Sequence, residues 1–309
     1  MAGKIVILGV FVADTAYRAE RPPRMGETIL GNSFALGPGG KGSNQSVAAA
    51  RAGGDVHLIS RLGQDDFAEM ALKTWADAGV TSSAVTQDRN SFTGAAYIFV
   101  EEVSGNNAII ICPGAAGDIS VDDVEAQRAL IEGAAVFVTQ LEQPMPAAHR
   151  GLDIARSAGV PTILNPAPAA PLSDNMLALC DFVTPNESEA EAITGVRVET
   201  VADAEKAADV LLSKGVGAAL ITLGAQGVFY KDAEHSAHVP SIPAGPVKET
   251  TGAGDAFNGG FATALAEGKP AIEAVRFGCA VAGVSVTRAG TAPSMPSRDE
   301  VDALLATQT

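Results

Sequence analysis

Two glycine-rich stretches of the chain combine polar side chains with backbone that can approach a ligand closely. The later stretch reads TTGAGDAFNGGF over residues 250–261, and it places Asp255 in a glycine turn directly before an apolar run. The run predicts a helix, and a helix N-terminus carries unpaired N–H groups and a partial positive charge. Gly252, Ala253 and Gly254 can therefore point N–H groups at one bound anion, typically a phosphate.

Asp255 is a poor choice for simple phosphate binding, because a carboxylate repels the anion. It suits a base that takes the proton from an alcohol as the alcohol attacks phosphorus. An ordinary helix start behind a glycine turn fits the same residues, so this motif alone leaves both interpretations open.

The earlier stretch reads GPGGKGSNQ over residues 37–45 and offers Lys41 and Asn44 as polar contacts. Its adjacent glycines, Gly39 and Gly40, let the backbone come close to a ligand. A P-loop is excluded because Gly42 follows the lysine, and no G-x-G-x-x-G follows the first strand, which disfavours a dinucleotide site and an NAD-dependent oxidoreductase. By itself this loop fits a structural turn equally well.

The elements around these motifs predict an α/β fold with a mainly parallel sheet and helices on both faces. Apolar runs predict strands at 4–10 and 56–60, and Ser43 is a candidate cap for a helix that ends before Gly53. From residue 121 onward strands and helices alternate, which is typical of a parallel sheet. The predicted strands are 134–140, 161–166, 181–186 and 218–224, and the predicted helices are 65–78, 121–132, 145–158, 187–194, 201–214, 253–267 and 271–287.

A small β lid is expected in addition to the main sheet. Residues 27–36 alternate weakly, and residues 94–112 read as a hairpin, so the two stretches can pair. We therefore predict a single domain over 1–309, with a lid inserted from about 12–38 and 92–112. In such sheets ligands bind at the carboxyl ends of the strands. The polar or glycine residues expected there are Asp14, Glu142, Asn165, Asn186, Glu189 and Gly224.

Composition narrows the class of partner. The 309 residues are 47% hydrophobic and carry a net charge of −15, so the chain can bury a large core and should repel nucleic acids and anionic membranes. No apolar stretch is long enough to span a membrane. The three separated cysteines are expected to be buried hydrophobes in a reducing cytoplasm, and the histidines lack zinc spacing.

Taken together, the two glycine stretches resemble the paired signatures of the PfkB family of carbohydrate kinases, and within that family they are most similar to the ribokinases. The resemblance covers nearly the whole chain, including GETILGN, TGAAYIFV, LNPAPA, TPNESEAE, LITLGAQGV and VTRAGTAPSMP. It implies phosphoryl transfer from ATP to the 5-hydroxyl of D-ribose, giving ribose 5-phosphate and ADP.

The resemblance also implies roles for individual residues. Asp255 would be the base, and residues 252–254 would form the anion hole. The sugar would be held by Asp14, Gly39, Gly40, Lys41, Asn44 and Glu142. Asn186 and Glu189 would order the Mg²⁺–phosphate region, and Thr222, Gly224 and Gly227 would border the nucleotide. A K⁺ site would be formed by Glu249, Thr251, Ser285, Arg288, Gly290 and Ser294. A homodimer through the lid is implied as well, covering apolar residues such as Ile29, Tyr97 and Phe99.

Two positions depart from the family pattern. Val12 stands where an asparagine is usual, and Glu249 stands where an aspartate is usual. The first leaves 2-deoxyribose, another sugar or a nucleoside as alternative substrates, and the second puts the geometry of the cation site in question. A non-catalytic sugar- or nucleotide-binding protein is the alternative from another class, although the intact base and anion hole count against it.

Overall fold

The computed structural model describes residues 3–308 and contains a large, mostly parallel sheet. Within that range its nine strands lie in the order β13-β12-β11-β10-β9-β8-β1-β4-β5, and the only antiparallel pairings are β11 with β12 and β12 with β13. The strands are β1 (Lys4–Leu8), β4 (Asp55–Leu62), β5 (Thr81–Gln87), β8 (Val136–Thr139), β9 (Thr162–Leu164), β10 (Phe182–Val183), β11 (Ala218–Thr222), β12 (Val228–Lys231) and β13 (Ser236–Val239).

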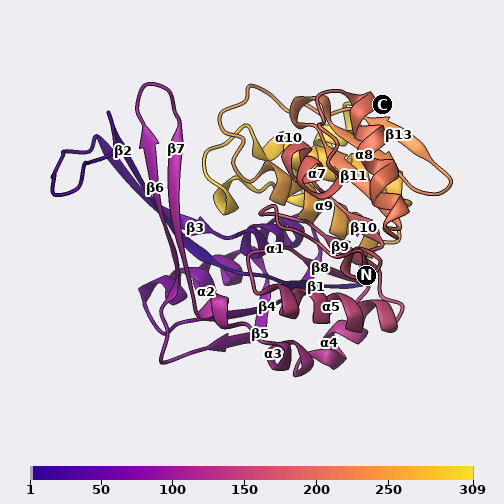
Figure 1. Cartoon of the computed structure of the whole chain (residues 1–309), viewed down its shortest axis with the longest axis horizontal. Helices are drawn as coiled ribbons and strands as arrows, with labels where there is room; N and C mark the ends of the chain where they lie inside the picture. The colour runs from indigo at the N-terminus through magenta and orange to yellow at the C-terminus, as the bar shows by residue number, and fades with distance from the viewer. Residues whose placement is uncertain (1–2, 309) are drawn as a thin grey trace.

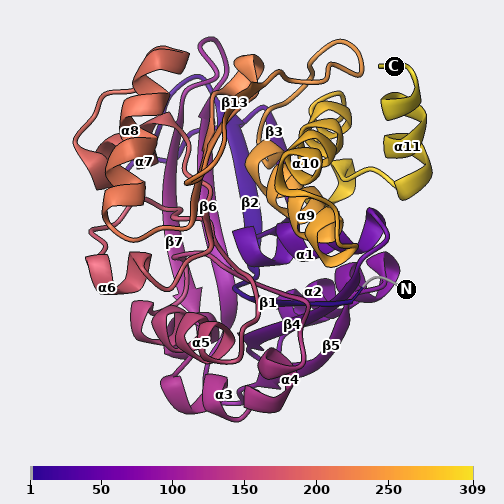
Figure 2. The ribbon, with the colours of Figure 1, turned by 90° about the vertical axis from the view of Figure 1, so that its right-hand side faces the viewer.

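Helices cover both faces of this sheet, as the alternating pattern predicted (Figure 2). Successive residues of β1 point to opposite faces, so Ile5 and Ile7 pack on one helix layer and Val6 and Leu8 on the other. The first layer contains α1 (Lys41–Arg51), α2 (Asp66–Ala78), α9 (Ala253–Ala266), α10 (Ala271–Ser285) and α11 (Arg298–Ala306). The second contains α3 (Val121–Glu125), α4 (Arg128–Glu132), α5 (Met145–Ser157), α6 (Asp174–Leu177), α7 (Glu187–Thr194) and α8 (Val201–Ser213).

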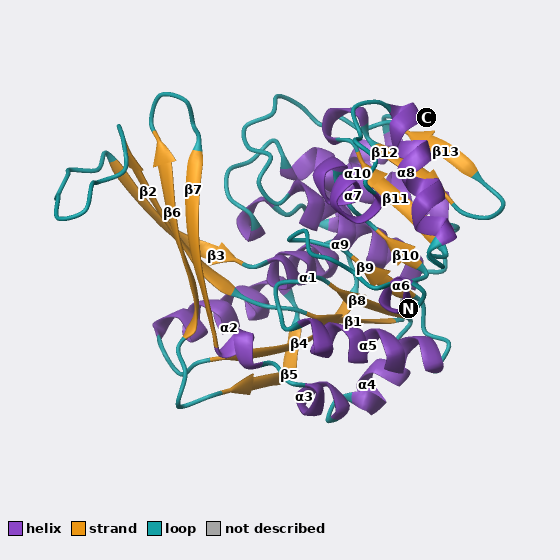
Figure 3. Cartoon of the chain, in the orientation of Figure 1, coloured by secondary structure: helices purple, strands orange, loops and turns teal. Residues whose placement is uncertain are grey.

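A separate four-stranded sheet projects from the body of the molecule (Figures 1 and 3). Its order is β3-β2-β6-β7, and it is formed by β2 (Val12–Ala19), β3 (Ser33–Gly39), β6 (Thr93–Glu101) and β7 (Asn107–Gly114). β6 and β7 form the predicted hairpin, and β2 pairs with β6 in parallel. We call this sheet the lid.

The structure corrects four local expectations. Ser43 does not cap α1, because the helix begins two residues earlier behind Gly40 and the Ser43 hydroxyl accepts a hydrogen bond from Trp75 Nε1. The helix expected over 121–132 is divided into α3 and α4, since the chain leaves helical geometry at Gln127. Residues 27–32 form an exposed loop, and the strand begins only at Ser33. Cys112 is exposed, because it lies on β7 at the edge of the lid.

Candidate active site

The carboxylate of Asp255 lies in the first turn of α9, beside a helix N-terminus without a side-chain cap. Gly252 precedes the helix with φ 82°, a backbone conformation that favours glycine. Ala253 N–H donates to the carbonyl of Thr250 at 3.1 Å, so this amide is already engaged. Of the three predicted anion-hole residues, Ala253 is therefore the one whose N–H already has a backbone partner.

Two amide side chains hold the carboxylate of Asp255, which is only 7% exposed. Asn44 Nδ2 donates to Oδ2 at 3.0 Å, and Gln45 Nε2 donates to Oδ1 at 3.1 Å. Burial raises the pKa of Asp255, while the charge of Lys41 and these two amides act in the opposite direction. A desolvated carboxylate that is kept ionised by fixed donors is well suited to accept a proton.

The earlier glycine stretch brings further polar groups to the same place. Gly40 is the N-cap of α1, and Lys41 N–H donates to Glu142 Oε2 at 2.7 Å. A Cβ atom on Gly39 would lie 2.1 Å from Asp14 Oδ2, so only glycine lets this carboxyl group pack against the loop. The two distant motifs thus meet at the carboxyl ends of the parallel strands, as predicted.

A cavity of about 460 Å³ opens between these groups and the lid. Asp14, Lys41, Asn44, Glu142 and Asp255 form its polar wall. The apolar part of the lining includes Val12, Ala96, Ile98, Ile109 and Ile111, all from strands of the lid. Burial, followed by repulsion from Asp255, raises the pKa of Asp14 to about 6, and burial raises that of Glu142 to about 7. Several acceptors in one half-apolar cavity match a small polyhydroxylated ligand.

The predicted nucleotide residues lie at the ends of neighbouring strands. Asn186 caps α7 and shares a reciprocal capping box with Glu189, and it also forms a β-bridge with Thr222, the last residue of β11. Gly224 and Gly227 flank a short turn with φ values of 51° and 98°. Glu189 is buried, which raises its pKa, and the charges of Lys41 and Asp255 act on it as well. None of Thr222, Gly224 and Gly227 lines the cavity of Asp255.

The residues of the predicted cation site come from the segment before α9 and from the end of α10 with the segment after it, and a hydrogen bond joins the two segments. Gly290 N–H donates to Glu249 Oε2 at 2.8 Å, and Gly252 lies against Thr291. The side chains of Ser285 and Ser294 donate to local carbonyl groups, and the Arg288 guanidinium pairs with Glu300. Thr251 lines the cavity beside Gly252. Oxygen ligands from this site would therefore be mainly backbone carbonyls together with the Glu249 carboxylate.

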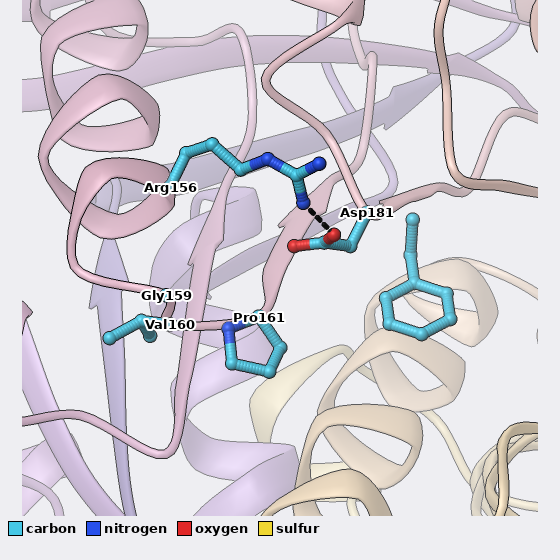
Figure 4. Close-up of a pocket in the computed structure, with 6 residues that line it drawn as sticks. Arg156, Gly159, Val160, Pro161 and Asp181 are labelled. Atoms are coloured by element: carbon cyan, nitrogen blue, oxygen red, sulfur yellow. Dashed lines mark hydrogen bonds and ion pairs between the residues drawn. The ribbon is translucent and has the colours of Figure 1, made fainter.

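A second hollow, of about 410 Å³, lies on the opposite edge of the sheet, where β9 and β10 begin (Figure 4). Its charged groups satisfy one another, because Arg156 pairs with Asp181 and Thr162 N–H donates to the same carboxylate at 3.0 Å.

Over residues 3–308, no cluster of three or more His, Cys, Asp or Glu side chains could hold a metal ion, and no described helix is long and apolar enough to cross a membrane.

Sequence reasoning missed a set of buried amides and hydroxyls behind Asp255. These residues are Gln45, Gln140, Thr184 and Asn258, and each is 1% exposed or less. Gln45 directly precedes the small residues SVAAA in the predicted helix, and that contrast is the signal in the sequence that could have found it.

The fold and the cavity together define a ribokinase-like α/β enzyme, a phosphotransferase that uses an alcohol group as acceptor. The chain belongs to the pfkB family of carbohydrate kinases, whose family model matches residues 2–298. It is 40% identical to a ribokinase of Haemophilus influenzae over 300 residues, covering 97% of both proteins. It is 32% identical to a deoxyribokinase of Salmonella typhimurium, covering 97% of this chain and 98% of that one. The structure matches that of Arabidopsis thaliana ribokinase complexed with ribose and ATP, with a TM-score of 0.92, 33% identity and 99% coverage of each chain.

Proposed function

We propose that this protein transfers the γ-phosphoryl group of ATP to the 5-hydroxyl of D-ribose, giving ribose 5-phosphate and ADP. The observation that carries the proposal is the position of Asp255, buried beside the N-terminus of α9 in a cavity lined with sugar-compatible acceptors. Full-length similarity to ribokinases, one of them complexed with ribose and ATP, supports the choice of substrates.

The chemistry follows from the side chains at the site. The sugar hydroxyl loses its proton to the Asp255 carboxylate as its oxygen bonds to the γ-phosphorus of ATP. The bond from that phosphorus to the β–γ bridging oxygen breaks, and ADP leaves. The N-terminus of α9 faces the negative charge on the transferred group, with the amides of Gly252 and Gly254 as donors. Asp14, Asn44 and Glu142 hold the sugar hydroxyls, and the lid limits the access of water.

Mg²⁺ fits this site as a companion of ATP. Asn186 Oδ1 accepts hydrogen bonds from Ser188 and from the backbone of Glu189, so it has little capacity left for a direct metal bond. Glu189 and Asn186 would act on the metal through water, while the nucleotide phosphates supply the direct ligands. Bound in this way, Mg²⁺ neutralises phosphate charge. Thr222, Gly224 and Gly227 would border the nucleotide.

We also propose a K⁺ site beside the anion hole. The hydrogen bond between Gly290 and Glu249 joins the segment that carries Thr251 to the segment that carries Ser285, Arg288 and Ser294. A carboxylate and several carbonyl groups offer the oxygen ligands that a hard cation prefers. The ion would order the loop before α9 and add positive charge near the transferred phosphoryl group.

The lid supports the proposal of a homodimer. Tyr17, Phe34 and Tyr97 lie on the lid face turned away from the cavity, where they are 42%, 57% and 37% exposed. The ring of Tyr17 packs against Phe34 and Tyr97, with centroids 5.0 and 5.5 Å apart. A small sheet with an uncovered aromatic face is marginal alone, so a second lid would stabilise it. Phe99 needs no such cover, since it is only 7% exposed.

The same chemistry on 2-deoxyribose is the second candidate function. Val12 lines the cavity and offers no hydrogen bond to a sugar hydroxyl, and a deoxyribokinase is among the similar proteins.

A reducing cytoplasm is the compartment that we infer, since Cys112, Cys180 and Cys279 all carry free thiols and ATP is the phosphoryl donor.

A coupled ADP-release screen over pentoses, deoxypentoses, hexoses and nucleosides tests the proposal. We expect ribose among the best substrates, and no ribose-dependent ADP release would overturn it. Asp255→Asn should keep the fold and ATP binding but lose turnover by about 10²-fold or more, the usual effect of removing a proton-transfer group. Nearly full turnover in this variant would show that Asp255 is not the base.

A further inference from the structure

A chain of buried hydrogen bonds starts at the Asp255 carboxylate and runs away from the cavity. Gln45 Nε2 donates to Asp255 Oδ1 and to Asn165 Oδ1, both at 3.1 Å. Asn165 Nδ2 then donates to the carbonyl of Thr184 at 3.0 Å. Gln45, on α1, is fully buried and does not line the cavity, so it contacts the carboxylate from behind.

The chain closes into a ring on the helix that carries the base. Thr184 Oγ1 donates to Asn258 Oδ1 at 2.7 Å, and Asn258 Nδ2 donates to the carbonyl of Gly254 at 2.8 Å. Gly254 is bonded covalently to Asp255. Side chains from α1, α9 and the ends of β9 and β10 are thereby tied to each other and to the anion-hole residue. We call this set the amide ring.

Both hydrogens and the oxygen of the Gln45 amide are engaged in one orientation. An ionised carboxylate only accepts, so the NH₂ group of Gln45 must face Asp255, and its second hydrogen goes to Asn165. The Gln45 oxygen accepts from Gln140 Nε2 at 2.7 Å. With both hydrogens committed and the oxygen occupied, the side chain is fixed and offers Asp255 a permanent donor.

We propose that Gln45 is a positioning residue for phosphoryl transfer, which holds Asp255 Oδ1 by a charge-assisted hydrogen bond and keeps the base both oriented and ionised. This inference rests on the proposed function, in which Asp255 is the base. Hydrogen bonds to the ionised form favour that form, so loss of this donor makes Asp255 easier to protonate.

Other charged groups also act on Asp255 and remain in place when Gln45 is changed. Lys41 on α1 favours the ionised form, whereas Asp14 on β2, Glu142 after β8 and Glu189 on α7 oppose it. In the proposed function Asp14 and Glu142 bind the sugar. Their protonation therefore changes KM more than it changes the kcat measured at saturating sugar. The acid side of the kcat–pH profile is therefore the measurement that reports on Asp255.

The test compares Gln45→Met with Gln143→Met in the full chain. Both glutamines are buried, and each donates two hydrogen bonds through its NH₂ group, but Gln143 donates to Thr139 and the Gln140 carbonyl instead of to Asp255. In Gln45→Met we expect the acid limb of kcat to move upward by roughly one pH unit, with kcat on that limb falling about tenfold and KM changing little. Gln143→Met should lose thermal stability without moving the limb. An unshifted limb in Gln45→Met, or an equal shift in both, would overturn the inference.

A second variant keeps the test decisive if Gln45→Met does not fold. Gln45→Glu has almost the same volume and places a carboxyl group against Asp255 Oδ1, so the two groups must share a proton. The acid limb should again move upward, and an unmoved limb in a folded, ADP-binding protein would contradict the proposal. Asp255→Asn distinguishes failure of the proposed base from failure of the role of Gln45. If Asp255→Asn retains turnover, Asp255 is not the base. If Asp255→Asn loses turnover but the acid limb does not move in the Gln45 variants, only the role of Gln45 is refuted.

Discussion

Replacing Glu142 by glutamine should stabilise the ligand-free protein. The carboxyl group is half-buried, and burial raises its pKa from 4.5 to about 7, with further increases from Asp255 and Asp14. A rise of that size corresponds to about 3 kcal/mol of folding free energy lost when the group is ionised. Water reaches Glu142 through the cavity and screens its charge, so we expect a smaller gain of about 1–2 kcal/mol.

The sign of the effect gives it a distinctive pH dependence. Because the folded-state pKa is raised, the penalty is absent below the unfolded value of 4.5, grows as the pH rises, and is complete above about 7. Glutamine keeps an oxygen that can accept the hydrogen bond from Lys41 N–H. The stability difference between Glu142→Gln and the native protein should therefore be largest at pH 8 and close to zero at pH 4.5.

Thermal unfolding at pH 8, 7, 6 and 5, without sugar or nucleotide, measures this difference. A gain of 1–2 kcal/mol corresponds to a Tm increase of roughly 1.5–3 °C for a chain of this size. Glu191→Gln, on the exposed side of α7, is the matched control and should change stability by less than about 0.5 kcal/mol. A Tm gain independent of pH, or a variant less stable than the native protein at pH 8, would refute the electrostatic reasoning.

Three further predictions follow from other parts of the molecule. K⁺ should raise kcat relative to Na⁺ or tetramethylammonium, and Glu249→Gln should reduce that difference; equal rates in all three salts would remove the proposed cation site. Gly259→Ala should lower the free energy of unfolding by about 1–3 kcal/mol, because the new Cβ would lie 2.5 Å from Ala48 Cβ between α1 and α9. Gly37→Ala is the control and should leave stability unchanged, because there is open space around Gly37. Light scattering at micromolar concentration should give a dimer for the native chain and a monomer for Tyr97→Glu, and a native monomer would contradict the lid interface.

The sequence predicted the main sheet well, because long apolar runs and regular alternation depend on the chain itself. Strands such as β1 are buried on both faces, and that burial requires a nearly continuous apolar run. Short-range capping was less predictable. Ser43 has a good residue type for a cap, but α1 begins at Lys41 because Gly40 adopts a positive φ of 86° and Trp75 takes the serine hydroxyl. The competing partner lies 32 residues away, so no local pattern contains it.

The same limit applies to the site. Asp255, Lys41 and Asn44 could be chosen as candidates because each lies in a short glycine-rich motif, and the structure places all three on the wall of one cavity. The amide ring could not be predicted, since Gln45 is separated from Asn165 by 120 residues and from Asp255 by 210. An isolated amide in a sequence does not indicate its partner, and only the fold brings these groups within hydrogen-bonding distance.

Val12 offers the sharpest test of substrate choice, because it lies on the cavity wall at the start of β2, two residues before Asp14. A site that hydrogen-bonds a hydroxyl rejects an analogue without it, since its own polar group is left unpaired. Valine imposes no such penalty, so we expect measurable turnover of 2-deoxyribose as well as ribose.

An asparagine at this position would restore a polar partner for a sugar hydroxyl. Val12→Asn should shift the ratio of kcat/KM for ribose over 2-deoxyribose toward ribose by about 0.5–1.5 kcal/mol, or roughly two- to twelvefold. Val12 is only 5% exposed and belongs to the buried apolar core, so the variant also loses stability, and a Tm measurement separates that effect from selectivity. Because both sugars are compared within one variant, a general loss of activity cancels in the ratio. An unchanged ratio would mean that Val12 serves only to pack the strand and that another group meets the hydroxyl.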